Sequence, residues 1–133
     1  RFDDRSRQTV FDFAGSMGVM ARENQDGSFT FTFEKTGDLS LLASGDERVG
    51  NEGPIVMSLS REQARDNPAL MLELTRLSGF EPSTNFSLHA GRARDGSIVL
   101  SMAIPRDQFD LSALENGFDR LTRHLDAAQA TAR

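Results

Sequence analysis

The chain has 133 residues, a net charge of −5 and no cysteine. This length predicts one domain, residues 1–133, and the lack of cysteine excludes disulfides and cysteine-based zinc sites. Fourteen arginines and one lysine are scattered along the sequence, so the acidic chain offers no basic patch to nucleic acid or to an anionic membrane. No apolar run approaches the ~20 residues of a membrane span. We therefore expect a cytoplasmic protein without nucleic-acid or membrane partners.

The first predicted element is a helix over residues 6–18. Val10, Phe13 and Met17 recur on one helical face, and Gly18 is suited to the left-handed residue that ends a helix. Phe11 points away from this face. A helix that is apolar on two sides must be covered on both or must expose one.

Three strands are expected next, over 28–34, 39–44 and 55–59. The first alternates strictly, with Phe29, Phe31 and Phe33 on one face. These rings fit either the core of the domain or a partly exposed groove, and the sequence leaves both alternatives open. Between the last two strands, residues 45–53 are polar, and we expect a mobile loop there.

A second helix is expected from Pro68, with Asn67 as its N-cap and Gly79 as its stop. Phe80 is expected to fold back on Leu74 behind this stop. Because an apolar helix on so small a domain suits an isologous interface, its apolar residues are predicted to form a homodimer interface. These residues are Leu70, Met71, Leu74, Leu77 and Phe80.

The chain should end with a hairpin, 86–93 and 97–104, and a last helix that starts near Asp110 or Ser112. Residues 127–133 are expected to fray. The predicted order is α-β-β-β-α-β-β-α. Because short turns join most of the strands, this order predicts an α+β fold, an antiparallel sheet with helices packed on it.

The sequence offers no arrangement for catalysis or for metal binding. His89 and His124 lie far apart, and neither has a metal-ligand neighbour at i+4. Neither a nucleophile elbow nor a glycine-rich nucleotide loop is present. We therefore expect no enzyme, no cofactor and no metal, but a protein that acts by binding another protein.

Five segments, in order and over about residues 8–126, resemble the class I chaperones of type III secretion, the Tir chaperone family. The segments are Phe13–Val19, Asp26–Phe33, Leu70–Phe80, Leu88–Pro105 and Leu111–Leu121. Gly117 departs from the last helix of that family, and Thr75–Leu77 stands where its members often carry an asparagine.

The resemblance implies a bacterial homodimer that binds the extended N-terminal segment of a secreted effector without ATP. We expect this segment to dock on the first helix and the first strand, at apolar residues that could each add to its affinity. These residues are Phe11, Met17, Val19, Phe29, Phe31 and Phe33. One alternative is an adaptor or regulatory protein of the same fold that is not tied to secretion. Another, for Phe11 alone, is that its ring packs on a loop of its own domain.

Overall fold

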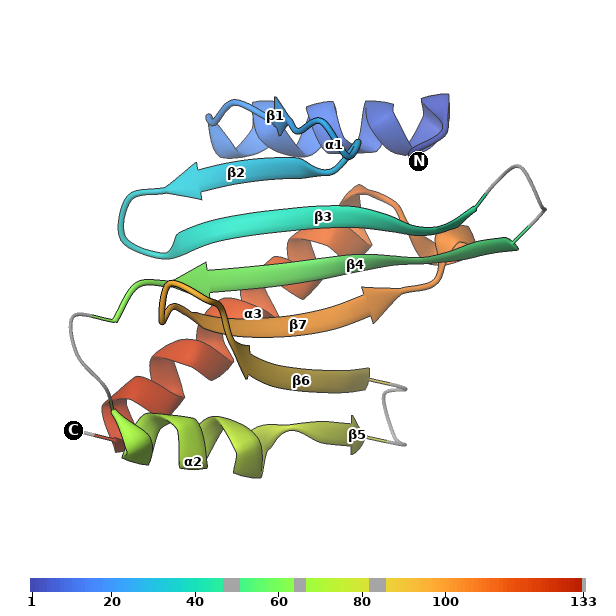
Figure 1. Cartoon of the computed structure of the whole chain (residues 1–133). Helices are drawn as coiled ribbons and strands as arrows, with labels where there is room; N and C mark the ends of the chain where they lie inside the picture. Colours follow the sequence, from blue (N-terminus) through green and yellow to red (C-terminus); the bar gives the residue numbers. More distant parts are fainter. Residues whose placement is uncertain (47–50, 64–66, 82–85, 133) are drawn as a thin grey trace.

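The computed structural model describes residues 1–46, 51–63, 67–81 and 86–132. Its helices are α1 (Asp4–Met17), α2 (Pro68–Leu77), the short 3-10 helix η2 (Arg106–Gln108) and α3 (Leu111–Thr131). Its strands are β1 (Arg22–Glu23), β2 (Phe29–Phe33), β3 (Gly37–Asp46), β4 (Asn51–Arg61), β5 (Gly79–Glu81), β6 (Phe86–Arg92) and β7 (Ile98–Ile104). Across the described residues they form one antiparallel sheet in the order β1-β2-β3-β4-β7-β6-β5 (Figure 1).

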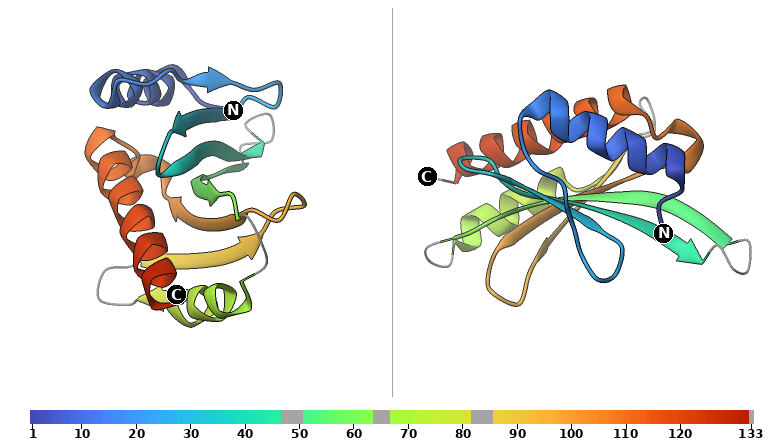
Figure 2. Two further views of the ribbon diagram at one scale, coloured as in Figure 1. Left: turned by 90° about the vertical axis from the view of Figure 1, so that its left-hand side faces the viewer. Right: turned by 90° about the horizontal axis from the view of Figure 1, so that it is seen from above.

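The helices cover one face of this sheet, which confirms the predicted α+β class. Helix α3 crosses the middle of that face and packs on β4 and β7, whereas α1 lies beside β2 (Figure 2). Helix α2 lies at the other end of the sheet, where it contacts α3 and β6. The core is therefore a single layer between the sheet and the three helices.

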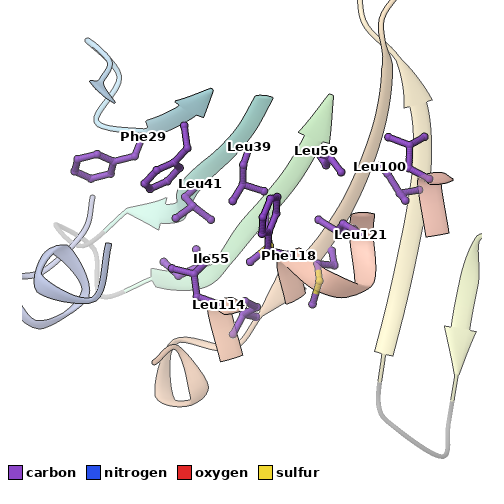
Figure 3. Packing of buried hydrophobic residues seen from close by; sticks show 14 of the residues in the cluster. Phe29, Leu39, Leu41, Ile55, Leu59, Leu100, Leu114, Phe118 and Leu121 are labelled. Carbon is purple, nitrogen blue, oxygen red and sulfur yellow. The ribbon is translucent and has the colours of Figure 1, made fainter. Parts of the chain in front are cut away.

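Alternation along the strands sends large apolar side chains into this layer. Phe29, Leu39, Ile55 and Leu100 are fully buried there, in one layer with Leu114, Phe118 and Leu121 of α3 (Figure 3). Gly117 explains how closely α3 approaches the sheet. A Cβ atom at Gly117 would lie 3.0 Å from the Cε of Met57 and 3.2 Å from the Sδ of Met102, so the glycine permits close packing of α3 on the sheet.

Side-chain caps set the start of each α-helix. A side-chain oxygen of Asp3 accepts from the Ser6 N–H at 2.7 Å, that of Asn67 from Leu70 at 3.1 Å, and that of Asp110 from Ala113 at 2.8 Å. The sequence therefore identifies the start of α2 and of α3 correctly. Gly18, with a φ of 68°, ends α1 as predicted.

The predicted loop over 45–53 is wrong for most of its length. Strands β3 and β4 continue through Asp46 and from Asn51 onward, and residues 47–50 lie outside the described part. The guanidinium of Arg106 donates to the carbonyl oxygens of Ser44, at 2.9 Å, and Gly53, at 2.7 Å. Arg106 is distant in sequence, and its hydrogen bonds stabilise as strand a segment whose polar composition alone predicts a loop.

Two predicted helix ends are also wrong. Ser78 closes α2 in an extended conformation, and Gly79 begins strand β5, where it pairs with Leu88 instead of adopting a left-handed stop. The side chain of Phe80, and thus its expected contact with Leu74, lies outside the described part. Helix α3 continues to Thr131 because Ala128 is buried, so most of the segment expected to fray is helical.

Candidate partner-binding surface

Three exposed apolar side chains lie on different sides of α1 and on the turn that follows it. Phe11 is 44% exposed, Met17 40% and Met20 87%; we call these three residues the α1 surface. In the described part of the chain, the other large exposed apolar residues are Leu42 on β3 and Leu72 on α2. Three of the five large exposed apolar residues described thus lie on α1 or the turn after it, and Phe11 and Met17 are among the predicted binding residues.

Aromatic contacts join the α1 surface to the core. The Phe11 and Phe29 rings meet edge-on with centroids 5.7 Å apart, and Phe13 meets Phe31 in the same way at 5.3 Å. Phe33 stacks on Phe118 at 4.6 Å. The first helix and the first long strand thus lie together, as the sequence analysis expected. Phe11 packs on β2, the strand beside α1, and not on a loop.

The expectation that Phe29 and Phe31 line the surface is wrong, because both are fully buried. Strand alternation sends them to the face that α1 and α3 cover, so the core alternative holds for these two rings. Phe33 and Val19 are half-buried and pack against the core. Phe29 and Phe31 support the α1 surface from below.

Arg7 was not identified from the sequence, although it holds this region together. Its guanidinium carbon lies 5.7 Å from the centre of the Phe11 ring and 5.4 Å from that of Phe29. Its two terminal nitrogens donate to the carboxylate of Glu23 on β1, at 2.7 and 3.2 Å. These hydrogen bonds lower the pKa of Glu23 and raise that of Arg7. The i,i+4 spacing of Arg7 and Phe11 is the signal that would have found this contact.

The outer edge of β2 is only partly covered. Strand β1 pairs with it at two positions, Arg22 with Thr30 and Glu23 with Phe29. Among the described residues, Phe31–Phe33 therefore pair with β3 alone. A groove of about 340 Å³ runs beside this edge, lined by Met20, Ala21, Arg22, Thr30 and Thr32. An extended peptide can add a strand to such an edge and place alternate side chains in the groove.

Two residues of the predicted dimer interface do not face solvent. Leu70 and Leu74 are fully buried within a single chain, where α2 packs against α3 and β6. Met71 is half-buried, and the side chains of Leu77 and Phe80 lie outside the described part. Leu72 is 73% exposed. Leu70 and Leu74 belong to the core of the domain because one side of α2 must cover the end of the sheet.

Within the described residues, no group of three or more histidines, cysteines, aspartates or glutamates is placed to hold a metal ion. His89 lies on the open side of the sheet, with Nε2 3.1 Å from the Ser87 hydroxyl, and His124 Nδ1 lies 2.8 Å from the Arg120 carbonyl oxygen. In the same part of the chain, no helix has the length and apolar character to span a bilayer.

The fold belongs to a class of α+β domains in which helices cover one face of a twisted antiparallel sheet. A chain from the solved HopA1–SchA chaperone–effector complex has this fold, with a TM-score of 0.66, 16% identity, and coverage of 98% of this chain and 99% of that chain. An uncharacterized protein from Methanothermobacter thermautotrophicus has it too, with a TM-score of 0.62, 9% identity, and 96% of each chain covered. At these identities the likeness shows the fold alone. No family model matches the sequence, and no curated protein matches it.

Proposed function

We propose that the chain is a class I type III secretion chaperone of the bacterial cytoplasm. It binds the extended N-terminal segment of a cognate effector and keeps that effector soluble and competent for secretion. The α1 surface beside the open edge of β2 is the observation that carries this proposal. The fold shared with a chain of a chaperone–effector complex supports it.

The two parts of the site do different work. The free edge of β2 supplies backbone donors and acceptors to any extended sequence, whereas the α1 surface selects apolar side chains. Full burial of one phenylalanine or methionine side chain contributes ~1.5–3 kcal/mol. Ordering an unfolded segment costs ~2–5 kcal/mol or more, so several apolar anchors must act together. The net charge of −5 favours basic segments and speeds their association.

We also propose a homodimer, formed through the exposed side of α2 around Leu72. A two-fold axis there would repeat the α1 surface and the β2 edge, so one long segment could contact both copies. The function requires no reaction, and we assign no catalytic residue, cofactor, metal or nucleotide to it.

Co-expression with the product of the neighbouring gene tests the proposal. We expect the partner to be soluble and to co-purify only when its N-terminal segment is present, because a type III chaperone binds a local, unfolded segment. Phe11→Glu should abolish co-purification, and Ser16→Glu, the same change of charge on another side of α1, should not. Retention of a partner that lacks its N-terminal segment would contradict the proposal.

An adaptor or regulatory role remains the second candidate. The same fold in the archaeal protein, at 9% identity, shows that the fold tolerates sequences very different from this one. An adaptor would bind a folded domain. Limited proteolysis of the complex separates the two roles, because a segment bound in extended form is cleaved soon after the chaperone is removed, whereas a folded domain stays resistant.

A further inference from the structure

Strand β1, at the edge of the sheet beside β2 (Figure 1), carries two charged residues that face opposite sides of the sheet. Glu23 pairs with Phe29, whose ring lies against α1, and its carboxylate binds Arg7 of that helix. Arg22 pairs with Thr30. Because side chains alternate along a strand, both point to the side that the helices leave open. In the part of the chain that the structure describes, the exposed Arg22 forms no hydrogen bond or ion pair.

The groove of about 340 Å³ beside β2 lies on this open side, because Thr30 and Thr32 line it. Arg22 is the one lining residue that carries a full charge. Met20, which is 87% exposed, adds apolar surface to the same groove. Asp38 of β3 pairs with Thr32, so it stands beside the end of the groove away from Arg22. A carboxylate that enters the groove is therefore attracted at the Arg22 end and repelled at the other.

The Thr30 hydroxyl adds a second donor next to Arg22. The side-chain amide of Asn24 donates to Thr30 Oγ1 at 2.9 Å and to Ser28 Oγ at 3.0 Å. A threonine hydroxyl has one hydrogen to donate, and that of Thr30 is donated to none of the described residues. Because Asn24 already donates to this oxygen, the hydroxyl hydrogen points elsewhere. The group that fits a guanidinium and a hydroxyl donor together is a negatively charged acceptor, such as a carboxylate.

We propose that this groove, the Arg22 groove, binds an acidic side chain of the partner's extended segment at Arg22 and Thr30, and an apolar side chain two residues away against Met20. In an extended chain, residues i and i+2 share a face and lie ~6.7 Å apart, as Thr30 and Thr32 do on β2. The proposal rests on the proposed function in that the partner is an extended segment, and it adds the chemistry that selects this segment. It requires no backbone pairing to β2. Since the chain has a net charge of −5, the acidic residue is a local requirement, and other residues of the segment can be basic.

Seven-residue peptides, capped at both ends, probe the groove, and the methyl resonance of Met20 reports binding. The central residue is glutamate, leucine stands two residues to either side, and serine fills the other positions, so that the pattern is the same in both directions. Two matched peptides carry glutamine or lysine in the centre. We expect the glutamate peptide to shift Met20 and to bind at least about 3-fold more tightly than the glutamine peptide, which is the scale of an exposed ion pair. The lysine peptide should bind most weakly.

Charge reversal locates the binding. Arg22→Glu should reverse the order, so that the lysine peptide binds more tightly than the glutamate peptide. Arg94→Glu makes the same change of net charge at an exposed residue in the β6–β7 turn and should leave the order as it is. Thr30→Val keeps the shape of the side chain and removes the hydroxyl, so it should weaken the glutamate peptide more than the glutamine peptide. Circular dichroism shows which variants are folded, and the Arg22 and Arg94 pair decides if Thr30→Val is not.

The same order of the three peptides in Arg22→Glu as in the unmodified chain would overturn the proposal. The lack of any Met20 shift at about 1 mM glutamate peptide, where even weak binding is detectable, would overturn it too. A partner segment that loses affinity for Phe11→Glu but keeps it for Arg22→Glu would overturn the Arg22 groove and leave the proposed function standing. Loss of affinity for Arg22→Glu, with Arg94→Glu unaffected and Phe11→Glu unaffected, would support the groove and contradict the α1 surface.

Discussion

The ring of Phe11 rests edge-on against the ring of Phe29, with their centroids 5.7 Å apart. Phe11 is exposed to solvent, and Phe29 is fully buried. The exposed ring is thereby fixed on the core before any partner arrives, and Arg7 lies over both rings. A binding residue held in this way loses little conformational freedom when it is covered.

Phe11→Glu should separate binding from folding. The variant loses an aromatic pair worth ~0.5–1.5 kcal/mol and leaves the buried rings in place, so we expect a small fall in the melting temperature. Partner retention in a pull-down should be lost, because a carboxylate would then stand in the apolar surface. A large fall in the melting temperature with binding intact in the folded fraction would place Phe11 in the core and remove it from the site.

Phe31→Ala should act on stability. Phe31 is fully buried against Phe13, and truncation of a buried phenylalanine costs ~3–5 kcal/mol. Denaturant unfolding should show this loss, against ~1 kcal/mol for Phe11→Ala. Equal losses in the two variants would mean that the structure assigns the wrong ring to the core.

Leu72 and Leu74 form a matched pair on α2 for the proposed dimer. Leu72→Asp changes an exposed side chain and should yield a folded monomer of 14.7 kDa by light scattering, against twice that mass for the unmodified chain. Leu74→Asp places a carboxylate in the core and should lower the free energy of unfolding by at least about 3 kcal/mol. An unmodified chain of 14.7 kDa at micromolar concentration would exclude the dimer.

The Asp3 cap of α1 makes the stability of the fold depend on pH. Hydrogen bonds from Ser6, above all from its backbone N–H, lower the pKa of Asp3. A carboxylate with a lowered pKa in the folded state stabilises above its unfolded pKa, about 4. That stabilisation is lost as the pH falls through the lower, folded pKa. Asp3→Ala should therefore cost ~1 kcal/mol near neutrality, and this cost should shrink below about pH 4. A cost that does not change down to pH 2 would contradict a charged cap.

Much of the fold could be predicted because local signals and tertiary contacts agree. The capping residues Asn67 and Asp110 each begin a helix, and Gly96, with a φ of 90°, turns the hairpin as expected. Prediction failed where distant residues decide the outcome. Arg106 binds the backbone at Ser44 and Gly53, and no periodicity within 45–53 contains that information.

The candidate site was predictable only in part for the same reason. Amphipathic spacing set Phe11 apart from the buried face of α1, but it placed the exposed Met17 on that face. Apolar residue type alone could not separate Phe29 in the core from Met20 in solvent. Leu70 and Leu74 were assigned to a dimer because the sequence shows an apolar stripe and not the element that covers it. Gly117 is unusual inside a helix, and the reason for it lies in the tertiary structure, where Met57 and Met102 leave no room for a larger side chain.

Methionine-methyl NMR of the chain during titration with its partner's N-terminal segment tests the central claim most directly. The five methionines are well spread, with Met17 and Met20 at the α1 surface and Met57 in the core. We expect the Met17 and Met20 resonances to shift in proportion to the bound fraction, while that of Met57 stays in place. A segment that binds and leaves both Met17 and Met20 unshifted would contradict the account.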